Sequence, residues 1–278
     1  MKFSILIANY NNGKYFQECY QSLLSQTYQN WEAVILDDCS TDNSVEILKD
    51  IFKDDARFRF YQNKKNEGVG FTKGKLIELA QGEICGFVDP DDAILPAAIK
   101  KAVNIFEKEK EVVLTYSRFI KCDENLKPVS QNKSAKQVLN GNRYFFNCPI
   151  VINHFVCFRR KTYFETEKIN PKLKISEDQD LYLKLYEQGK VRFIDDANYL
   201  YRFHSGGISQ NENKQKSREF WGKVIFNAMK RRNLKAINGK KIPETYTDAR
   251  EIFELLDYQN SIQYRLKKKI KVFFQNLL

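Results

Sequence analysis

Three carboxylates stand close together directly after a short apolar run. Residues 84–88 read Ile-Cys-Gly-Phe-Val, and Asp89, Asp91 and Asp92 follow with only Pro90 between them. An apolar run of this length predicts a buried strand that delivers the three acids to one spot. Clustered carboxylates repel one another, and hard divalent cations such as Mg2+ or Mn2+ prefer such oxygen ligands. The pattern therefore indicates a metal site at a strand end, with an acidic turn that caps the next helix as the alternative.

Acids follow a second apolar run in the same way. Residues 33–36, Ala-Val-Ile-Leu, lead directly into Asp37 and Asp38. In open α/β sheets, ligands bind at the carboxyl ends of the strands. Two strands that both end in acids therefore place the two clusters along one sheet edge, and this predicts a site there.

A helical pattern further along the chain opens with another acid. Asp178, Leu181, Tyr182 and Leu185 recur at the spacing of one helix face. Because Asp178 is aligned with the apolar side chains, its carboxylate is expected to look into a cavity. The alternative is a carboxylate at a helix start that is stabilised by the helix macrodipole.

Histidines and cysteines are the other side chains that bind metals. His154 and His204 are the two histidines of the chain. Each fits a hydrogen-bonded structural group, and an imidazole beside a carboxylate-bound Mn2+ is also chemically reasonable. The six cysteines are scattered without a close pair at metal-ligand spacing. We expect them to be reduced thiols, most of them buried.

Alternating strands and helices are expected to position these residues. Apolar runs predict strands at 3–8, 33–36, 58–61, 84–88, 112–116, 151–158, 191–194 and 199–203. Helical patterns lie between most of them, which implies an α/β fold with a mainly parallel sheet, right-handed crossovers and helices on both faces. From about 117 to 160 the pattern loosens, as suits a loop-rich wall that recognises a second substrate.

Charge is unevenly distributed along the chain. The 278 residues carry a net charge of +11, and residues 214–278 alone hold 16 Lys/Arg against six Asp/Glu. This last part is predicted to be helical. Its terminal stretch repeats Leu266, Ile270, Phe273, Phe274 and Leu277 among basic residues, without an acid. Such a helix either packs on the domain with a solvated charged face or lies in an anionic membrane surface.

With these pieces in place, the chain resembles the family 2 inverting glycosyltransferases of the GT-A fold over roughly residues 3–208. The likeness rests on an ordered set of short motifs. They are Ser4-Ile-Leu-Ile-Ala-Asn-Tyr-Asn11, Ser25-Gln26-Thr27, Asp37-Asp38-Cys39-Ser40-Thr41-Asp42, Asn66-Glu67-Gly68, Ala80-Gln81-Gly82-Glu83, Asp89-Pro90-Asp91-Asp92, Glu177-Asp178 and Tyr201-Arg202-Phe203-His204. Each motif is weak alone, whereas the ordered set is specific.

The resemblance implies which residues bind a nucleotide-sugar donor. These residues are Ala8, Tyr10, Asp38, Asn66, Lys73 and Asp91. Tyr10 would pack on the base, Asp38 would hydrogen-bond the edge of the base, as fits uridine, and Asp91 would lie at the ribose. The family usually has Arg-Asn where this chain has Lys73-Gly74, and lysine lacks the planar fork of arginine. Ala8 and Asn9 also replace a common Pro-Thr pair.

The resemblance further implies the metal site and the general base. Asp92 would bind the Mn2+ or Mg2+ that bridges the diphosphate, with Asp89 supporting and His204 completing the site. Asp178 would remove the proton of the acceptor hydroxyl as its oxygen attacks the anomeric carbon from the face opposite the leaving group. A single displacement of this kind inverts the anomer and needs no covalent intermediate.

These expectations combine into one functional hypothesis. The chain would be a UDP-sugar-dependent transferase that builds surface polysaccharide or a lipid-linked glycan, with a catalytic domain at 1–210 and a basic helical extension at 211–278. Residues 1–116 would bind the donor and 117–210 the acceptor. The absence of an apolar run of 18 residues and of a signal pattern predicts a cytoplasmic protein. The basic C-terminal helix would then dock it on the inner face of the cell membrane.

Two other functions fit parts of the sequence. A nucleotidyltransferase can also use a doubly wound sheet with acidic metal ligands, but it normally has a Gly-rich loop after the first strand, and Gly13 is the only glycine in that turn. A nucleic-acid-binding protein would account for the basic last part of the chain. Acids at the site would repel phosphates unless a metal neutralised them, so we expect no nucleic-acid partner.

Overall fold

The computed structural model describes residues 1–204 and 214–275. Its strands include β1 (Phe3–Asn9), β2 (Trp31–Asp37), β3 (Phe58–Gln62), β4 (Ile84–Phe87), β5 (Ala93–Ile94), β6 (Val112–Cys122), β7 (Pro128–Gln131), β8 (Cys157–Arg159) and β9 (Lys190–Arg202). Its longer helices are α1 (Phe16–Leu24), α2 (Ser44–Phe52), α3 (Val69–Leu79), α4 (Ala98–Lys108), α5 (Arg160–Phe164), α6 (Glu177–Tyr186), α7 (Lys214–Arg231), α8 (Ala249–Glu254) and α9 (Ile262–Gln275).

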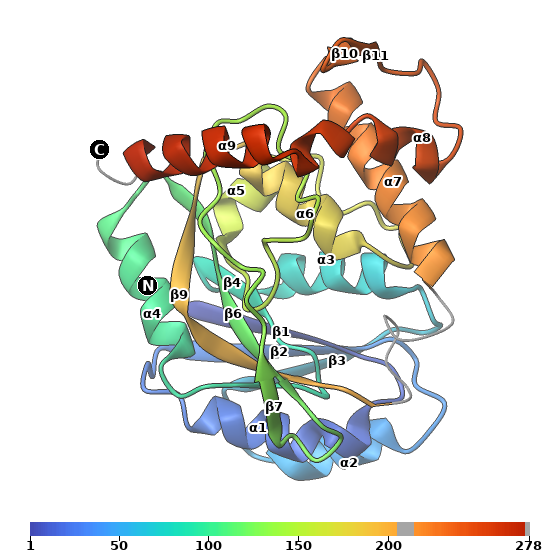
Figure 1. Cartoon of the computed structure of the whole chain (residues 1–278). Helices are drawn as coiled ribbons and strands as arrows, with labels where there is room; N and C mark the ends of the chain where they lie inside the picture. The colour runs from blue at the N-terminus through green and yellow to red at the C-terminus, as the bar shows by residue number, and fades with distance from the viewer. Residues whose placement is uncertain (205–213, 276–278) are drawn as a thin grey trace.

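Strands β1 to β9 form one nine-stranded mixed sheet in the order β3-β2-β1-β4-β8-β6-β9-β5, with β7 paired to β6. The pairs β3–β2, β2–β1, β1–β4 and β6–β9 are parallel, whereas β8 runs antiparallel to both of its neighbours. The carboxyl ends of β1, β2 and β4 therefore lie at one edge (Figure 1). This confirms the predicted α/β fold with a mainly parallel sheet.

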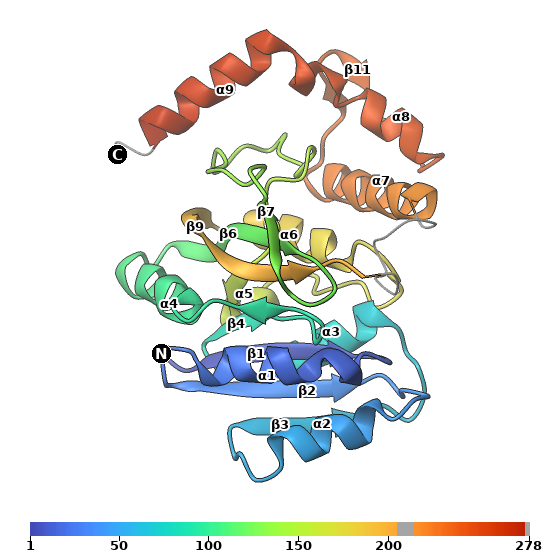
Figure 2. The same ribbon diagram turned by 60° about the horizontal axis from the view of Figure 1, so that its bottom comes forward.

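Side chains of alternating direction supply two cores, one on each face of the sheet. Phe3, Ile5 and Ile7 of β1 pack in a cluster with α1, α2 and α4, while Leu6 points to the opposite cluster with α3, α6 and α7. Such two-faced burial is expected of strands within a sheet that helices cover on both sides. Figure 1 shows α1 and α2 below the sheet and α3 and α6 above it, and Figure 2 shows α1 in front of β1 and β2.

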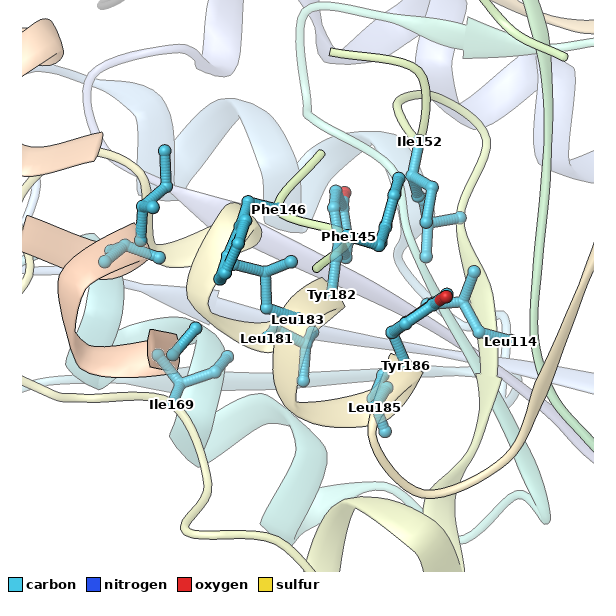
Figure 3. Close-up of a cluster of buried hydrophobic side chains, with 14 of the residues drawn as sticks. Leu114, Phe145, Phe146, Ile152, Ile169, Leu181, Tyr182, Leu183, Leu185 and Tyr186 are labelled. Carbon is cyan, nitrogen blue, oxygen red and sulfur yellow. The ribbon is translucent and has the colours of Figure 1, made fainter. Parts of the chain in front are cut away.

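Helix α6 is the centre of the second core. Among the aromatic and aliphatic side chains around it, Figure 3 shows Phe145, Phe146 and Ile152 beside its Tyr182. The ring centroids of Phe145 and Tyr186 lie 4.5 Å apart. Helices α7 and α8 add Ile225 and other apolar residues to the same cluster. The α6 N-terminus, which carries Asp178, is thus fixed by packing.

Two predicted strands are one in the structure. The patterns at 191–194 and 199–203 belong to the single strand β9, which pairs with β6 through a register shift. Ser117 of β6 pairs with Ile194 and Arg118 pairs with Ala197, so two acidic residues, Asp195 and Asp196, are left out of the ladder. A bulge of this kind interrupts the alternation of a strand without ending it, so the sequence pattern shows two apolar runs where the structure has one strand.

The predicted strand at 151–158 was mostly wrong, because only β8 pairs there. The buried Asn147 side chain organises the preceding segment instead. Its Oδ1 accepts hydrogen bonds from the backbone N–H groups of Val151 and Ile152, at 2.9 and 2.8 Å, and its Nδ2 donates to the Ile152 carbonyl. The Asn147 side chain therefore supplies hydrogen bonds to backbone groups that a neighbouring strand would otherwise pair.

The last part of the chain is not helical throughout. A short hairpin of β10 (Ala236–Ile237) and β11 (Lys240–Lys241) separates α7 from α8, with the left-handed Asn238 and Gly239 at its turn.

The domain boundary predicted at residue 210, and Leu277 of the terminal pattern, lie outside the described residues. None of the described helices is both long and apolar enough to cross a membrane.

Candidate active site

A cleft of about 1000 Å3 opens at the carboxyl ends of the parallel strands. It is lined by segments that are far apart in the sequence, including the turn after β1, the turn after β4 and the start of α6. All ten residues predicted for the site line this cleft: Ala8, Tyr10, Asp38, Asn66, Lys73, Asp89, Asp91, Asp92, Asp178 and His204. The structure thus brings the predicted residues together, although their roles are a separate question.

The end of β1 is tied to the end of β2. The buried Asn9 donates from Nδ2 to Asp37 Oδ1 at 2.7 Å, and the Asn11 N–H donates to Ser40 Oγ at 2.9 Å. Tyr10 lies between these anchored residues and keeps 44% of its surface exposed on the cleft. A fixed backbone with an exposed ring is a suitable platform for a flat ligand such as a base.

Asp38, at the end of the neighbouring strand β2, organises the adjoining rim of the cleft. One carboxylate oxygen accepts hydrogen bonds from Asn63 Nδ2 at 2.8 Å and the Glu67 N–H at 2.9 Å, and the other accepts from the Gly68 N–H at 2.8 Å. Only 4% of Asp38 is exposed. Its carboxylate therefore positions the loop that carries Asn66, whose side chain is exposed at the rim.

Asp92 is bound on both carboxylate oxygens by the protein itself. Oδ1 accepts from the Arg202 N–H at 2.7 Å, and Oδ2 accepts from the Tyr199 hydroxyl at 2.8 Å. The Arg202 guanidinium also donates to the Asp91 carbonyl at 2.6 Å. Since Asp92 is only 1% exposed, its geometry fits a residue that fastens the acidic turn to β9 better than the metal ligand expected from the sequence.

Asp91 presents its carboxylate to a histidine. Its Oδ2 lies 2.8 Å from Nε2 of His204, and the His204 ring lies against Tyr15 with centroids 4.7 Å apart. Carboxylate oxygen and imidazole nitrogen are ligand atoms that Mn2+ can bind together. In the described part of the chain, no three acids, histidines or cysteines are arranged to hold a metal. The pair would need further oxygens, and Mg2+ and similar ions commonly take these from substrate phosphates.

The acidic turn carries unfavourable negative charge. Burial raises the pKa of Asp91, and the neighbouring Asp89 raises it further, while His204 opposes the shift. The pKa of Asp92 is raised by burial and by both other acids. Positive charge brought into the cleft would relieve this repulsion.

Helix α3 contributes a lysine to the same cleft. Lys73 Nζ lies 2.7 Å from Glu177 Oε1, and both side chains are almost fully buried. Burial lowers the pKa of Lys73, but the carboxylates of Glu177, Asp89 and Asp178 outweigh that effect and leave the pKa well above its ordinary value. Lys73 therefore stays charged beside the acids.

Asp178 is half-buried on the cleft wall. Its carboxylate accepts hydrogen bonds from Gln179, at 2.8 Å from the backbone N–H and 3.2 Å from Nε2. Burial and the neighbouring Glu177 raise the pKa of Asp178 to about 6, against the opposing charge of Lys73. The expectation that this acid looks into a cavity is confirmed.

Three lining or supporting residues were not assigned to the site from the sequence, although His154 stood out as one of two histidines. His154 lines the cleft with its ring stacked 4.6 Å from that of Tyr199, and burial lowers its pKa to about 4. Asn147 donates to Gln179 Oε1 at 2.7 Å and so stands behind Asp178. Trp221 of α7 also reaches the cleft, and its buried Nε1 has no hydrogen-bond partner within residues 1–204 and 214–275. Only the rarity of Trp and His gave a signal for these positions.

Comparison with known proteins identifies a family and similar folds. The family model described as "Glycosyl transferase family 2" matches residues 4–165, more than half of the chain. The chondroitin synthase of Pasteurella multocida is 27% identical over 277 residues, which cover 97% of this chain. The structure of S. aureus TarS in complex with UDP-GlcNAc superposes with a TM-score of 0.69 and 20% identity, over 92% of this chain and 70% of that one.

Other matches show how far the likeness to known proteins extends. The mannosyltransferase PcManGT from Pyrobaculum calidifontis, solved with GDP-Man and Mn2+, gives a TM-score of 0.59 at 13% identity, over 99% of this chain and 87% of that one. Likenesses at such low identity concern the fold. The chain spans 27% to 33% of the length of the chondroitin and hyaluronan synthases that it matches.

Proposed function

The chain belongs to glycosyl transferase family 2, and we propose that it transfers a sugar from a UDP-sugar to a hydroxyl group of a growing polysaccharide or lipid-linked glycan, with inversion at the anomeric carbon. One observation carries this proposal. An acid on α6, Asp178, shares one cleft with the Asp91 and His204 pair and with the exposed ring of Tyr10. A base, a cation site and a platform for a nucleotide are the parts that such a transfer needs.

Donor binding is assigned to the β1 and β2 side of the cleft, in the half formed by residues 1–116. The Tyr10 ring would cover the base, and the loop held by Asp38 would close over it with Asn66 at its rim. Lys73 supplies positive charge near the diphosphate as a point charge, without the bidentate grip of an arginine. UDP is favoured as the carrier because the TarS structure with a similar fold holds UDP-GlcNAc.

Asp91 and His204 would hold a Mn2+ or Mg2+ together with the donor's diphosphate, and Asp89 would support the site. Such a cation neutralises the charge that develops on the leaving nucleotide. This assignment gives Asp91 the metal role that the sequence had suggested for Asp92. Asp92 keeps the turn in place through Tyr199 and Arg202.

Asp178 is proposed as the general base. Its raised pKa of about 6 leaves it mainly ionised at neutral pH while keeping it a better proton acceptor than an ordinary aspartate. The carboxylate would take the proton of the acceptor hydroxyl as that oxygen forms its bond to the anomeric carbon. The bond to the diphosphate breaks at the same time, so an α-linked donor gives a β-linked product.

We place this activity in the cytoplasm. All six cysteines are unpaired thiols, and four of them, Cys19, Cys85, Cys122 and Cys157, are buried. Secreted proteins usually carry disulfides, whereas cytosolic thiols are kept reduced. The expectation of reduced, mostly buried cysteines thus agrees with the structure and supports a cytoplasmic location.

A panel of nucleotide sugars tests the proposal. We expect a UDP-sugar with Mn2+ to raise the melting temperature, since a ligand that binds only the folded state stabilises it. The matching GDP- and CDP-sugars should have a smaller effect, and EDTA should abolish the shift. The same UDP-sugar should then be hydrolysed or transferred by the wild-type protein. Equal shifts with every nucleotide sugar would reject the assignment of a UDP-sugar as the donor. Turnover that is unaffected by EDTA would reject the role of the divalent cation.

A further inference from the structure

The outward face of α9 is apolar. Ile262, Leu266, Ile270, Phe273 and Phe274 are 74%, 57%, 56%, 62% and 58% exposed, and none of the helix residues described is buried. The amphipathic helix of a globular protein normally turns its apolar face to the core. Helix α9 lies along the outer side of the molecule (Figures 1 and 2), and the exposure of these side chains shows that its apolar face is turned away from the protein.

The inward face of α9 is the polar one. Gln275 accepts a hydrogen bond from the Asn140 N–H at 2.7 Å, and the Lys268 ammonium lies 5.7 Å from the centroid of the Phe145 ring. Tyr264 packs edge-on against Tyr258. Because positions 264, 268 and 275 share one side of a helix, these contacts fix the orientation that leaves the apolar side outward.

Basic side chains border the apolar face on both sides. Arg265 and Lys269 lie four residues apart along one edge, and Lys267 and Lys271 lie four apart along the other. All four are exposed, and none forms an ion pair with another residue of the described ranges. The segment 262–275 contains no acid.

We propose that α9 docks the protein on an anionic membrane surface, with its apolar face in the lipid and its two basic edges at the headgroups. This arrangement of charge and apolar surface is that of helices that lie in the membrane interface. Fourteen residues span roughly 21 Å as a helix, which is shorter than the hydrocarbon core of about 30 Å. The helix therefore lies on the membrane and does not cross it.

A second copy of this chain is a poorer partner for the same face. Two α9 helices packed face to face would bring eight unpaired basic side chains together, two sets of Arg265, Lys267, Lys269 and Lys271, without an acid to compensate. Anionic headgroups supply the missing negative charge. The charge pattern thus favours a lipid surface.

Docking through α9 would also hold the cleft near the membrane. The α8 residue Phe253 packs against Trp221 of α7 with ring centroids 5.2 Å apart, and Trp221 lines the cleft. Helices α7 and α8 thus connect the cleft wall to the helix that meets the lipid. If the proposed glycosyl transfer holds, this position suits an acceptor carried on a lipid.

Vesicle flotation tests the docking without reference to activity. We expect the wild-type protein to float with vesicles that contain phosphatidylglycerol and to stay at the bottom with neutral phosphatidylcholine vesicles. The double variant Ile270→Asp/Phe273→Asp should lose flotation, whereas Val129→Asp, at a valine on β7 that is 70% exposed, should retain it. Circular dichroism should show that both variants are folded.

A charge-reversal pair completes the test. Each basic residue near an anionic membrane contributes about fivefold to binding. Lys267→Glu/Lys271→Glu removes two of them and should therefore weaken binding to anionic vesicles by at least about tenfold. The control Lys100→Glu/Lys240→Glu changes two other exposed lysines by the same amount and should bind much more like wild type. Absence of wild-type flotation would overturn the proposal. So would a dimer in size-exclusion chromatography that the Ile270→Asp/Phe273→Asp variant abolishes while wild-type protein does not float.

Discussion

The Nζ atom of Lys73 lies 2.7 Å from a carboxylate oxygen of Glu177, so an almost fully buried ion pair joins α3 to the first turn of α6. Breaking such a pair leaves a buried charge without a partner and is strongly destabilising. The next residue of α6 is Asp178, whose pKa depends on both members of the pair. The ion pair therefore both fixes the helix and sets the proton affinity of the proposed base.

The Asp178→Asn variant should be nearly inactive but should still bind the donor. An amide cannot take a proton, and general-base catalysis contributes on the order of 100- to 10,000-fold to a rate. We expect kcat to fall within that range, while the Mn2+-dependent thermal shift with the UDP-sugar is unchanged. Asp195→Asn, at an exposed acid on β9, is the control and should keep wild-type kcat. Wild-type kcat in Asp178→Asn would assign the base elsewhere.

Asp91 and Asp92 should respond differently to the same substitution. In Asp91→Asn we expect a folded protein with near wild-type melting that no longer shows a Mn2+-dependent shift with UDP. In Asp92→Asn the amide nitrogen cannot accept the hydrogen bond that one carboxylate oxygen now accepts, from Tyr199 or Arg202. An unsatisfied buried group of this kind costs about 1–3 kcal/mol of unfolding free energy.

Chemical denaturation and thermal shift separate the two roles of these acids. Tyr199→Phe removes one of the Asp92 hydrogen bonds and should lower the unfolding free energy by about 1 kcal/mol. If Asp92→Asn were as stable as wild type and had lost the metal response, then Asp92 would be the cation ligand. The assignment of Asp91 would then be wrong.

Sequence patterns predicted which acids lie at the cleft, and the family resemblance supplied the other candidate residues. Apolar runs that end in acids, as at Leu36 and Val88, report strand ends directly, because the burial of a strand stops where its polar neighbours begin. The parallel order of β1, β2 and β4 then brings those ends to one edge. The position of Asp178 in a helical stripe was equally informative, since helical periodicity is local.

The roles of neighbouring acids could not be read from the sequence. Asp91 and Asp92 are adjacent and chemically identical. Contacts with residues more than 100 positions away distinguish them, namely His204 at Asp91 and the Tyr199 hydroxyl and Arg202 N–H at Asp92. The segment before β8 was misassigned for a similar reason, because the buried Asn147 side chain replaces the ladder there. Long-range side-chain contacts decided each of these cases.

Two glycines of α3 should differ sharply when replaced by alanine. A Cβ at Gly70 would lie 2.6 Å from the Leu173 carbonyl oxygen and 2.8 Å from that of Asn170, whereas a Cβ at Gly74 would meet only the Tyr163 hydroxyl, at 3.5 Å. Gly70→Ala should therefore push α3 from the loop that leads to α6 and destabilise the fold by about 1–3 kcal/mol. Gly74→Ala should be neutral or stabilising by up to about 1 kcal/mol.

Urea unfolding of the two variants measures this difference, and activity measures its consequence. Gly70 joins α3, which carries Lys73, to the loop that leads to Glu177. We therefore expect Gly70→Ala also to lower kcat, while Gly74→Ala leaves it near wild type. Equal stability of the two variants would mean that the loop at 170–173 moves to accommodate the extra methyl group without lowering the unfolding free energy. The close packing would then not be needed to position α6.

Variants of the ion pair should shift the pH dependence of the reaction in opposite directions. If Asp178 must be ionised to act, kcat/KM falls as the pH drops through the pKa of about 6. Lys73 lowers that pKa, so Lys73→Ala should move the acid limb to higher pH. Glu177 raises it, so Glu177→Gln should move the limb to lower pH. A nearby charge of this kind shifts a pKa by about 1 unit or more.

The pH profile of kcat/KM distinguishes this effect from simple damage to the fold. Loss of stability would lower activity at every pH in both variants, whereas a change in the pKa of the base moves the limb itself. The exposed pair of Lys190 and Glu111, 3.2 Å apart, supplies controls, since Lys190→Ala and Glu111→Gln remove the same charges far from the cleft and should leave the limb in place. Shifts in the same direction for Lys73→Ala and Glu177→Gln would show that Asp178 is not the titrating group.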